Sequence, residues 1–263
     1  IALTSLGLLR DQASEQALSK VRAAAHASRY EIRRVGEDTV TAARLLASRA
    51  TLARLVEEGN VLQLQLVLRR FCETAGLDAC ALFRDTGLVT AAGTAIPWDR
   101  AFDAASEQGE GFMIASRQRG PVGALVEIPG LAGGRVMTIR KLDDRLAAEL
   151  SKQVGVEIHL LPVTDWLEFV EPAYRDMHSE ALATGDIAVA PIPAREQFAA
   201  SLPLFASTGE AIVLIEARLP AEQVAGAVSS FVRRLVLVTI LLAAVALLAS
   251  LLLARRIGAP LQA

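Results

Sequence analysis

Three arginines occupy comparable places in segments whose composition is typical of β-strands. Arg84, Arg117 and Arg140 each stand at an alternate position that we expect to point to one side of a sheet. A guanidinium group binds a carboxylate through two parallel hydrogen bonds, so three of them on one face would suit a small anionic ligand. Trp98, in the loop expected after Pro97, can supply a roof. The alternative is a solvated sheet face, because one sequence does not reveal strand register.

The three histidines offer little chemistry. His26, His159 and His178 lack partners at the spacing of metal ligands, and we expect each at the surface or at the edge of the core. None is followed by the acidic residue and proline of a phosphoacceptor histidine. We therefore expect no catalytic residue, metal site or cofactor in this chain, and no nucleic-acid partner.

The two cysteines are expected in different surroundings. Cys72 falls near the end of a predicted helix, and Cys80 falls on a predicted core strand. This placement favours buried thiols over a disulfide, although a disulfide stays open if the compartment is oxidising.

The residues above lie in a chain whose pattern predicts an α+β fold with two antiparallel sheets. Its 263 residues are 52% hydrophobic and 21% charged, which excludes both a polytopic membrane protein and a disordered chain. A helix at about 102–107 lies within the first group of strands, Asp143 caps a helix that runs to Gly155, and a helix at about 166–184 lies within the second group. The expected strands are 79–85, 88–94, 111–120, 121–130 and 133–142, then 156–163, 186–193, 198–205 and 211–219.

The N-terminal part predicts one long helix. From Leu18 to Val56, residues that could form a seam recur at alternating steps of three and four, and Gly59 follows as a stop signal. The seam is interrupted by polar residues, and Gly36 costs about 1 kcal/mol relative to Ala inside a helix. We expect the helix to leave the membrane as half of a weak parallel dimer seam and then to pack along a globular body. A second helix is expected from Asn60 to Gly76.

The C-terminal segment predicts a membrane helix. Residues 235–254 contain no Asp, Glu, Lys or Arg, and twenty helical residues span about 30 Å, the thickness of a bilayer core. The first nine residues, IALTSLGLL, are also uncharged, and we interpret them as the end of a first membrane helix. A buried core helix at the C-terminus and a signal peptide at the N-terminus are the alternatives that we weighed.

Together these features resemble the extracytoplasmic double-Cache (PAS-like) sensor region of bacterial transmembrane receptors. The resemblance rests on the strand-turn-strand LFRDTGLV at 82–89, the strand-to-helix junction RKLDDRLAAEL at 140–150, and the tail ARRIGAPLQA at 254–263, which is similar to the start of a HAMP linker. It implies the following division: 1–9 first membrane helix, 10–59 signalling helix, 60–154 membrane-distal module, 155–219 membrane-proximal module, 220–254 stem and second membrane helix, and 255–263 linker.

The resemblance also implies a place and a function. In this family one sheet face packs on the long helix, and the other, roofed by loops, holds a small ligand. The chain would lie in the bacterial inner membrane with its body in the periplasm, and would be the input region of a receptor, with a sensor histidine kinase favoured. A chemoreceptor or a diguanylate cyclase is the alternative, and a membrane-anchored assembly protein that binds a protein partner is an alternative of another class.

Overall fold

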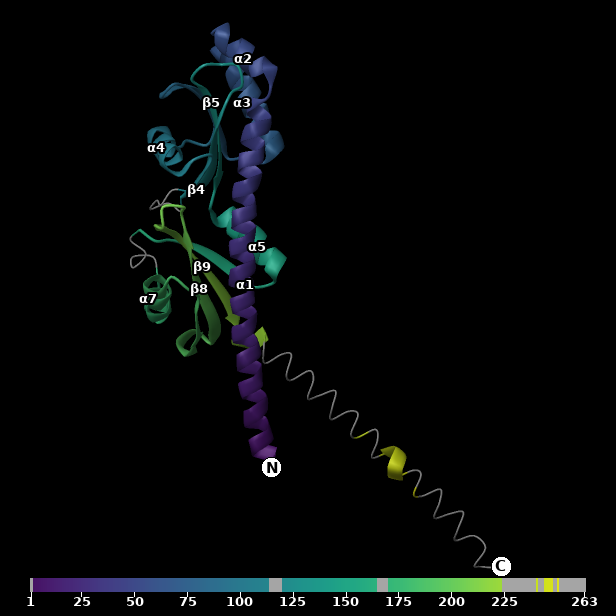
Figure 1. Cartoon of the computed structure of the whole chain (residues 1–263). Helices are drawn as coiled ribbons and strands as arrows, with labels where there is room; N and C mark the ends of the chain where they lie inside the picture. The colour runs from purple at the N-terminus through teal and green to yellow at the C-terminus, as the bar shows by residue number, and fades with distance from the viewer. Residues whose placement is uncertain are drawn as a thin grey trace, which may run out of the picture. The chain divides into compact units, whose positions relative to one another are not determined.

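The computed structural model describes residues 2–113, 120–164 and 170–223, together with residue 240, residues 244–247 and residue 250. Leu18–Leu219 forms one compact unit, in which a long helix accompanies two antiparallel sheets (Figure 1). The fold of this unit is α+β, as predicted. We call residues 60–154 the first module and residues 155–219 the second module.

The long helix α1 (Ala2–Ala47) packs against its own chain through the predicted seam. Val21 and Ala25 are completely buried, and Thr39 is buried where its main-chain oxygen accepts a hydrogen bond of 2.9 Å from the hydroxyl of Thr138. These positions are not exposed for pairing with a second chain, which corrects the expectation of a dimer seam along them. The homodimer itself stays a prediction.

The long helix also stops earlier than predicted. A separate helix, α2 (Ala50–Glu57), follows α1, whereas we expected one helix to residue 59. The backbone of Arg49 is extended between the two helices, with φ −74° and ψ 110°. The resulting change of direction lets Leu46 of α1 and Leu52 of α2 enter the same buried core.

The first module contains a five-stranded antiparallel sheet with the strand order β2-β1-β5-β4-β3. Five strands were predicted at these places, although of the expected strand at 111–120 the segment 114–119 lies outside the described residues. The strands are β1 (Ala79–Arg84), β2 (Gly87–Gly93), β3 (Gly111–Met113), β4 (Pro121–Glu127) and β5 (Gly134–Lys141).

Helices cover both faces of this sheet (Figure 1). Helix α3 (Val61–Ala75) packs with α1 and α2 on one face, where Leu68 and Leu82 belong to one core. Helix α4 (Trp98–Gln108) packs on the other face, where Phe83 belongs to a second core. The predicted capping of α3 is confirmed: the Asn60 side chain accepts a hydrogen bond of 3.2 Å from the main chain of Gln63.

Cys72 and Cys80 form a disulfide, with their Cα atoms 6.2 Å apart, which corrects the prediction of buried thiols. Gly76 ends α3 in the left-handed conformation, with φ 65°, and reverses the chain, so that β1 runs back beneath the helix. Cys72 on the buried face of α3 and Cys80 on the helix-facing side of β1 therefore meet in one core.

The second module begins after α5 (Asp144–Val154), whose predicted cap is confirmed by a hydrogen bond of 3.1 Å from the main chain of Leu146 to Asp143. Its four-stranded sheet has the order β6-β9-β8-β7. One face packs on helix α7 (Arg175–Thr184), which follows a short 3-10 turn at Pro172–Tyr174. Residues 166–169 of the helix expected at 166–184 lie outside the described part. The strands are β6 (Glu157–Pro162), β7 (Ala188–Ile192), β8 (Gln197–Phe205) and β9 (Ala211–Pro220).

The predicted membrane helix at 235–254 falls mainly outside the described residues, and the linker start at 255–263 falls wholly outside them. Within the parts of the chain that are described, no helix has the length and hydropathy that crossing a membrane requires.

Candidate functional site

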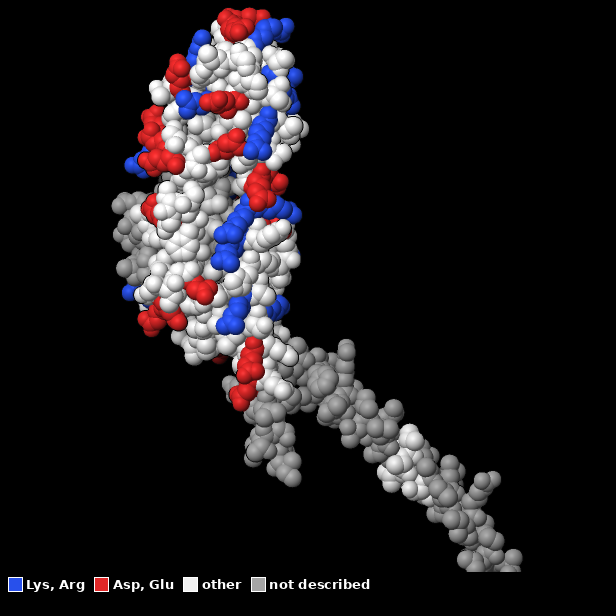
Figure 2. Space-filling view, in the orientation of Figure 1, with Lys and Arg blue, Asp and Glu red and all other residues white. Residues whose placement is uncertain are grey.

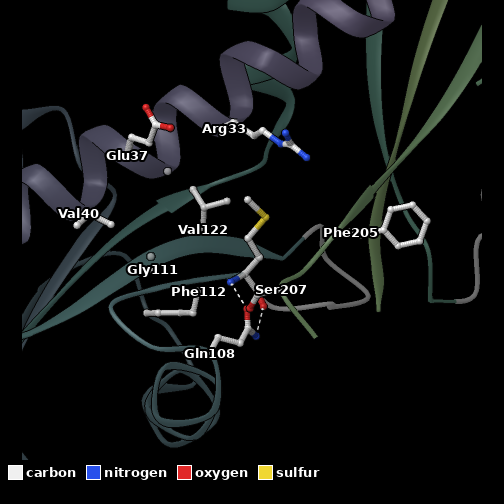
Figure 3. Close-up of a pocket in the computed structure, with 12 residues that line it drawn as sticks. Arg33, Glu37, Val40, Gln108, Gly111, Phe112, Val122, Phe205 and Ser207 are labelled. Atoms are coloured by element: carbon white, nitrogen blue, oxygen red, sulfur yellow. Dashed lines mark hydrogen bonds between the residues drawn. The ribbon is translucent and has the colours of Figure 1, made fainter. Parts of the chain in front are cut away.

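A pocket of about 280 Å³ opens where α1 and the two modules meet (Figure 3). Its walls come from parts of the sequence that are far apart. Helix α1 contributes residues between 33 and 40, the first module contributes the end of α4 with β3 and β4, and the second module contributes Phe205 and Ser207. A molecule bound here would therefore touch α1 and both sheets.

Glycines give this pocket its shape. A Cβ atom at Gly36 would meet no atom within 4 Å, so the space beside α1 is open there. A Cβ atom at Gly111 would lie 3.3 Å from the side chain of Val40, so glycine lets β3 approach α1 closely. At Gly123 the ring of Phe112 already occupies the place of a side chain. The first glycine leaves space, and the other two allow close packing around it.

Gln108 engages the outer edge of β3 at the wall of the pocket. Its amide nitrogen donates a hydrogen bond of 2.8 Å to the main-chain oxygen of Met113, and the Met113 N–H donates one of 3.1 Å to the amide oxygen. The hydroxyl of Ser207 donates to the same oxygen at 3.4 Å (Figure 3). Gln108 thus links the edge of the first sheet to the second module.

Two charged side chains line the pocket, both from α1. Arg33 extends toward the side where Phe205 lies, whereas Glu37 points away from Ser207 (Figure 3). Among the described residues, none forms an ion pair or a side-chain hydrogen bond with Arg33. The face shown in Figure 2 carries acidic and basic side chains interspersed, so a charged ligand would be recognised there by local groups and not by a broad field of one sign.

Two of the predicted site residues, Arg84 and Arg140, share a face of the first sheet but lie at its opposite ends. Arg84 is paired with Gly134, where β5 begins, while Arg140 stands near the end of β5, about 20 Å further along at strand spacing. Their face is the one covered by α1 and α3, because Leu82 and Thr138, two residues before each arginine, pack toward these helices. The structure does not bring the two guanidinium groups to one site.

Arg140 belongs to an ion cluster instead. Its guanidinium lies 3.7 Å from Asp78 and 3.3 Å from Glu149, and it donates a hydrogen bond to the main-chain oxygen of Gly76. Asp78 also pairs with Arg145 at 2.9 Å. These contacts join the turn between α3 and β1 to α5, so Arg140 holds the module together in this structure.

Trp98 lies on the opposite face, as the first residue of α4 and not in a loop as predicted. Its ring meets Phe83 edge-on, with the ring centroids 6.4 Å apart. Arg135 lies on the same side, 5.0 Å from the centroid of the Phe102 ring. The arginine of β5 on the α4 face is therefore Arg135, which the sequence analysis missed, because a shift of one residue along a strand reverses the face.

Arg117 lies in segment 114–119, outside the described residues, and its role as a ligand residue stays a prediction. The pocket was not predicted from the sequence, because Arg33 lies on the helix that we interpreted as a signalling helix and not as the wall of a ligand site. One signal for it existed. A glycine inside a long helix lowers helix stability, so Gly36 indicates a position where packing or function requires a residue without a side chain.

A buried polar network lies in the second module, between α7 and the sheet. His178 is completely buried, not at the surface or core edge as predicted, and its two ring nitrogens lie 2.8 Å from Ser201 Oγ and 2.9 Å from Glu216 Oε2. Ser201 and Glu216 are also completely buried. The Ser201–His178–Glu216 arrangement therefore presents no nucleophile at the surface. In the described part of the chain, no three His, Cys, Asp or Glu side chains gather into a metal site.

Charge balances within this network. Burial raises the pKa of Glu216, but hydrogen bonds from His178 and Arg218 outweigh it and hold the pKa below its ordinary value. Arg218 donates to the other carboxylate oxygen and stacks over the ring of Tyr174, with its guanidinium 4.3 Å from the centroid. Burial raises the pKa of the Tyr174 hydroxyl, which donates a hydrogen bond of 2.6 Å to Gln197. The network fastens α7 to β8 and β9.

No protein-family model and no curated protein sequence matches the chain. Its fold is similar to that of the extracellular domain of vpHK1S-Z8, a proposed histidine kinase, with a TM-score of 0.54 and 12% identity over 83% of this chain and 98% of that one. The LuxQ periplasmic domain of Vibrio cholerae gives 0.52 and 12% over 80% and 99%. The sensory domain of the Campylobacter jejuni chemoreceptor Tlp3, with isoleucine bound, gives 0.51 and 10% over 83% and 96%.

These similarities concern the fold. The chain has the fold found in extracellular and periplasmic sensory domains, and the predicted α+β arrangement of a long helix with two antiparallel sheets is confirmed. Ligands and output domains differ among proteins with this fold, so function has to be argued from the site.

Proposed function

We propose that this chain is the extracytoplasmic sensory region of a bacterial transmembrane receptor, which binds a small ligand and passes the signal across the inner membrane. The observation that carries the proposal is the joint attachment of both sheet modules to α1, in a fold shared with sensory domains. The segment 235–254, which lacks Asp, Glu, Lys and Arg, comes soon after the second module in the sequence and supplies the proposed membrane helix. The Cys72–Cys80 disulfide fits a body outside the reducing cytoplasm.

Labelling of single cysteines tests this topology. Leu62, which is 77% exposed on α3, is replaced by Cys in one variant, and Gln262 in the proposed cytoplasmic segment is replaced in another. The native cysteines are joined in a disulfide and give no background. A membrane-impermeant maleimide should label position 62 in cells with a permeabilised outer membrane and position 262 only after lysis. Labelling of both positions, or of neither, before lysis would contradict the topology.

Transmission is proposed to run through the segment that follows β9. No proline occurs between residues 221 and 254, so a continuous helix can carry movement of the second module to the membrane. The chain, fused after Ala263 to the output half of a HAMP-containing histidine kinase, should lose its response when four Gly-Ser residues are inserted between Val228 and Ser229. A response that survives the insertion undiminished would refute transmission along this segment.

The output of the receptor is proposed to be a histidine kinase, with a chemoreceptor or a diguanylate cyclase as the alternative. All three use the same kind of input and linker. The sequence encoded after Ala263 distinguishes them, because a phosphoacceptor histidine, a methyl-accepting coiled coil and a Gly-Gly-acidic cyclase loop differ plainly.

A parallel homodimer is part of the proposal. Since the predicted seam is buried in the chain, pairing requires the other face of α1, where exposed residues recur at steps of four, three and four. These residues are Ala23, Ala27, Tyr30 and Arg34.

Binding of a protein partner is a second candidate, favoured by one observation. Leu62, Leu66 and Val61 on α3 are 77%, 50% and 45% exposed. Exposed apolar side chains that cluster on one element often mark a contact with another protein. Substitution of Leu62 and Leu66 by Glu should abolish such a contact and leave ligand binding in the pocket unchanged.

A further inference from the structure

We propose that the pocket between α1 and the two modules binds a small monoanion with an apolar tail, of which a short branched carboxylate is the simplest example. This inference names a site and a ligand class for the sensory function proposed above, and its physiological meaning rests on that function.

The positive charge comes from Arg33 alone among the described residues that line the pocket. No described residue forms an ion pair or a side-chain hydrogen bond with its guanidinium, which extends toward the second module (Figure 3). Two-point binding of a carboxylate by a guanidinium is favourable in geometry and charge. Glu37 lines the same pocket but points away from Ser207, so the anionic group belongs at the Arg33 end.

The remaining polar groups of the lining are occupied with one another. Gln108 uses its amide nitrogen and oxygen on the main chain of Met113, and the hydroxyl of Ser207 donates to the same oxygen. A ligand with several hydroxyl or amide groups would find few free partners among these side chains, whereas water satisfies the same groups in solution. The ligand should therefore carry one polar end and no second one.

Apolar side chains form the rest of the wall. They come from α1, β3, β4 and the end of β8, and are Val40, Phe112, Met113, Val122 and Phe205. The volume of about 280 Å³ lies just below the usual range of about 300–1,000 Å³ for small-molecule sites, which favours a ligand of few atoms.

The position of the pocket gives binding a mechanical effect. A ligand held between Arg33 on α1 and Phe205 at the end of β8 contacts the second module, while its tail contacts β3 and β4 of the first. It can therefore favour one arrangement of the two modules over another, provided that its contacts differ between the arrangements.

Calorimetric titration tests the site directly. The full 263-residue chain is purified in lipid nanodiscs and titrated with sodium isovalerate, and with isovaleramide as a neutral molecule of the same shape. Empty nanodiscs correct for partition into lipid. Isovalerate should bind saturably with a stoichiometry of one per chain, and isovaleramide should bind at least about tenfold more weakly, because it lacks the charge that Arg33 would pair with.

Two variants and two matched controls locate the binding. Arg33→Gln removes the charge and should weaken isovalerate binding about tenfold or more. Gly36→Leu fills the pocket from α1, where a Cβ atom would meet nothing within 4 Å, and should abolish binding without disturbing the fold. Arg54→Gln, on α2 and paired with Glu58, and Ala183→Leu, at an exposed position of α7, should leave binding unchanged.

The outcomes separate this inference from the sensory role. No saturable isovalerate binding to the wild type, or equal binding to Gly36→Leu, would overturn the assignment of this pocket. If valine bound more tightly than isovalerate, and if Glu37→Gln removed this preference, the inference that the ligand has an uncharged tail would be wrong. If the kinase fusion described above still responds to ligand in the Gly36→Leu variant, the sensory role is supported but this pocket is not the sensory site. If the labelling places the body in the cytoplasm, the extracytoplasmic sensory role is wrong, but the titration result for the pocket remains valid.

Discussion

Replacement of Glu216 by Gln tests the buried network of the second module. The carboxylate is completely buried, lies 2.9 Å from His178 and accepts a hydrogen bond from Arg218, so the variant keeps the shape and leaves the arginine without its counter-charge. Removal of one partner from a buried pair costs about 3–5 kcal/mol. The Arg218 side chain is 18% exposed and stacks on Tyr174, so we expect the lower end, about 3 kcal/mol.

Thermal and urea unfolding of the full chain in detergent, followed by circular dichroism, measure this loss. For a domain of this size about 3 kcal/mol corresponds to a fall in Tm of about 6–12 °C. The double variant Glu216→Gln/Arg218→Met is the control: it removes both charges, keeps an amide beside His178, and should recover most of the stability, because the arginine no longer lacks a counter-charge.

The dependence on pH provides a second check. The pKa of Glu216 is below its ordinary value in the folded chain, so its ionised form stabilises the fold at pH values above the unfolded pKa. That contribution is lost as the pH falls through the folded pKa. The difference between wild type and Glu216→Gln should therefore be constant near neutral pH and shrink in acid. A difference below about 0.5 kcal/mol at pH 7, within the range of ordinary surface substitutions, would refute the reasoning, as would a difference that grows in acid.

Three further predictions concern other parts of the chain. Reduction of the Cys72–Cys80 disulfide should lower the free energy of unfolding by about 2.5 kcal/mol through loop entropy, and an unchanged urea midpoint in reductant would contradict this. Asp143→Ala should cost about 1 kcal/mol by removal of the helix cap, with Asp143→Asn as the control that retains it; equal losses in both would show that capping is not the cause. In membranes Ala27→Cys should crosslink to a dimer and the buried Val21→Cys should not, whereas the reverse pattern would place the dimer contact on the seam.

Local signals made much of the fold predictable. Asn60 and Asp143 were recognised as helix caps because a short polar side chain next to an amphipathic run leaves few other interpretations. The strands followed from alternating patterns between glycines and prolines. The break after Ala47 was missed, because the three- and four-residue spacing continues through Arg49 and only the packing of Leu46 and Leu52 shows the change of direction.

The site was less predictable, because it depends on which elements meet. The sequence placed Arg84 and Arg140 on one face correctly, but it did not show that the face is the one covered by α1 and α3. The disulfide was missed for the same reason, since the reversal at Gly76 is what brings Cys72 and Cys80 together. A pocket with walls from residue 33 to residue 207 has no local pattern at all.

Gln108 has a consequence for solubility. Strand β3 is at the edge of its sheet, and edge strands present unpaired N–H and C=O groups on which another extended chain can add. The amide of Gln108 occupies both outward groups of Met113, as a neighbouring strand would. Its loss would leave a template for strand addition, so the same side chain that joins the two modules also keeps the sheet from recruiting a stray strand and seeding aggregation.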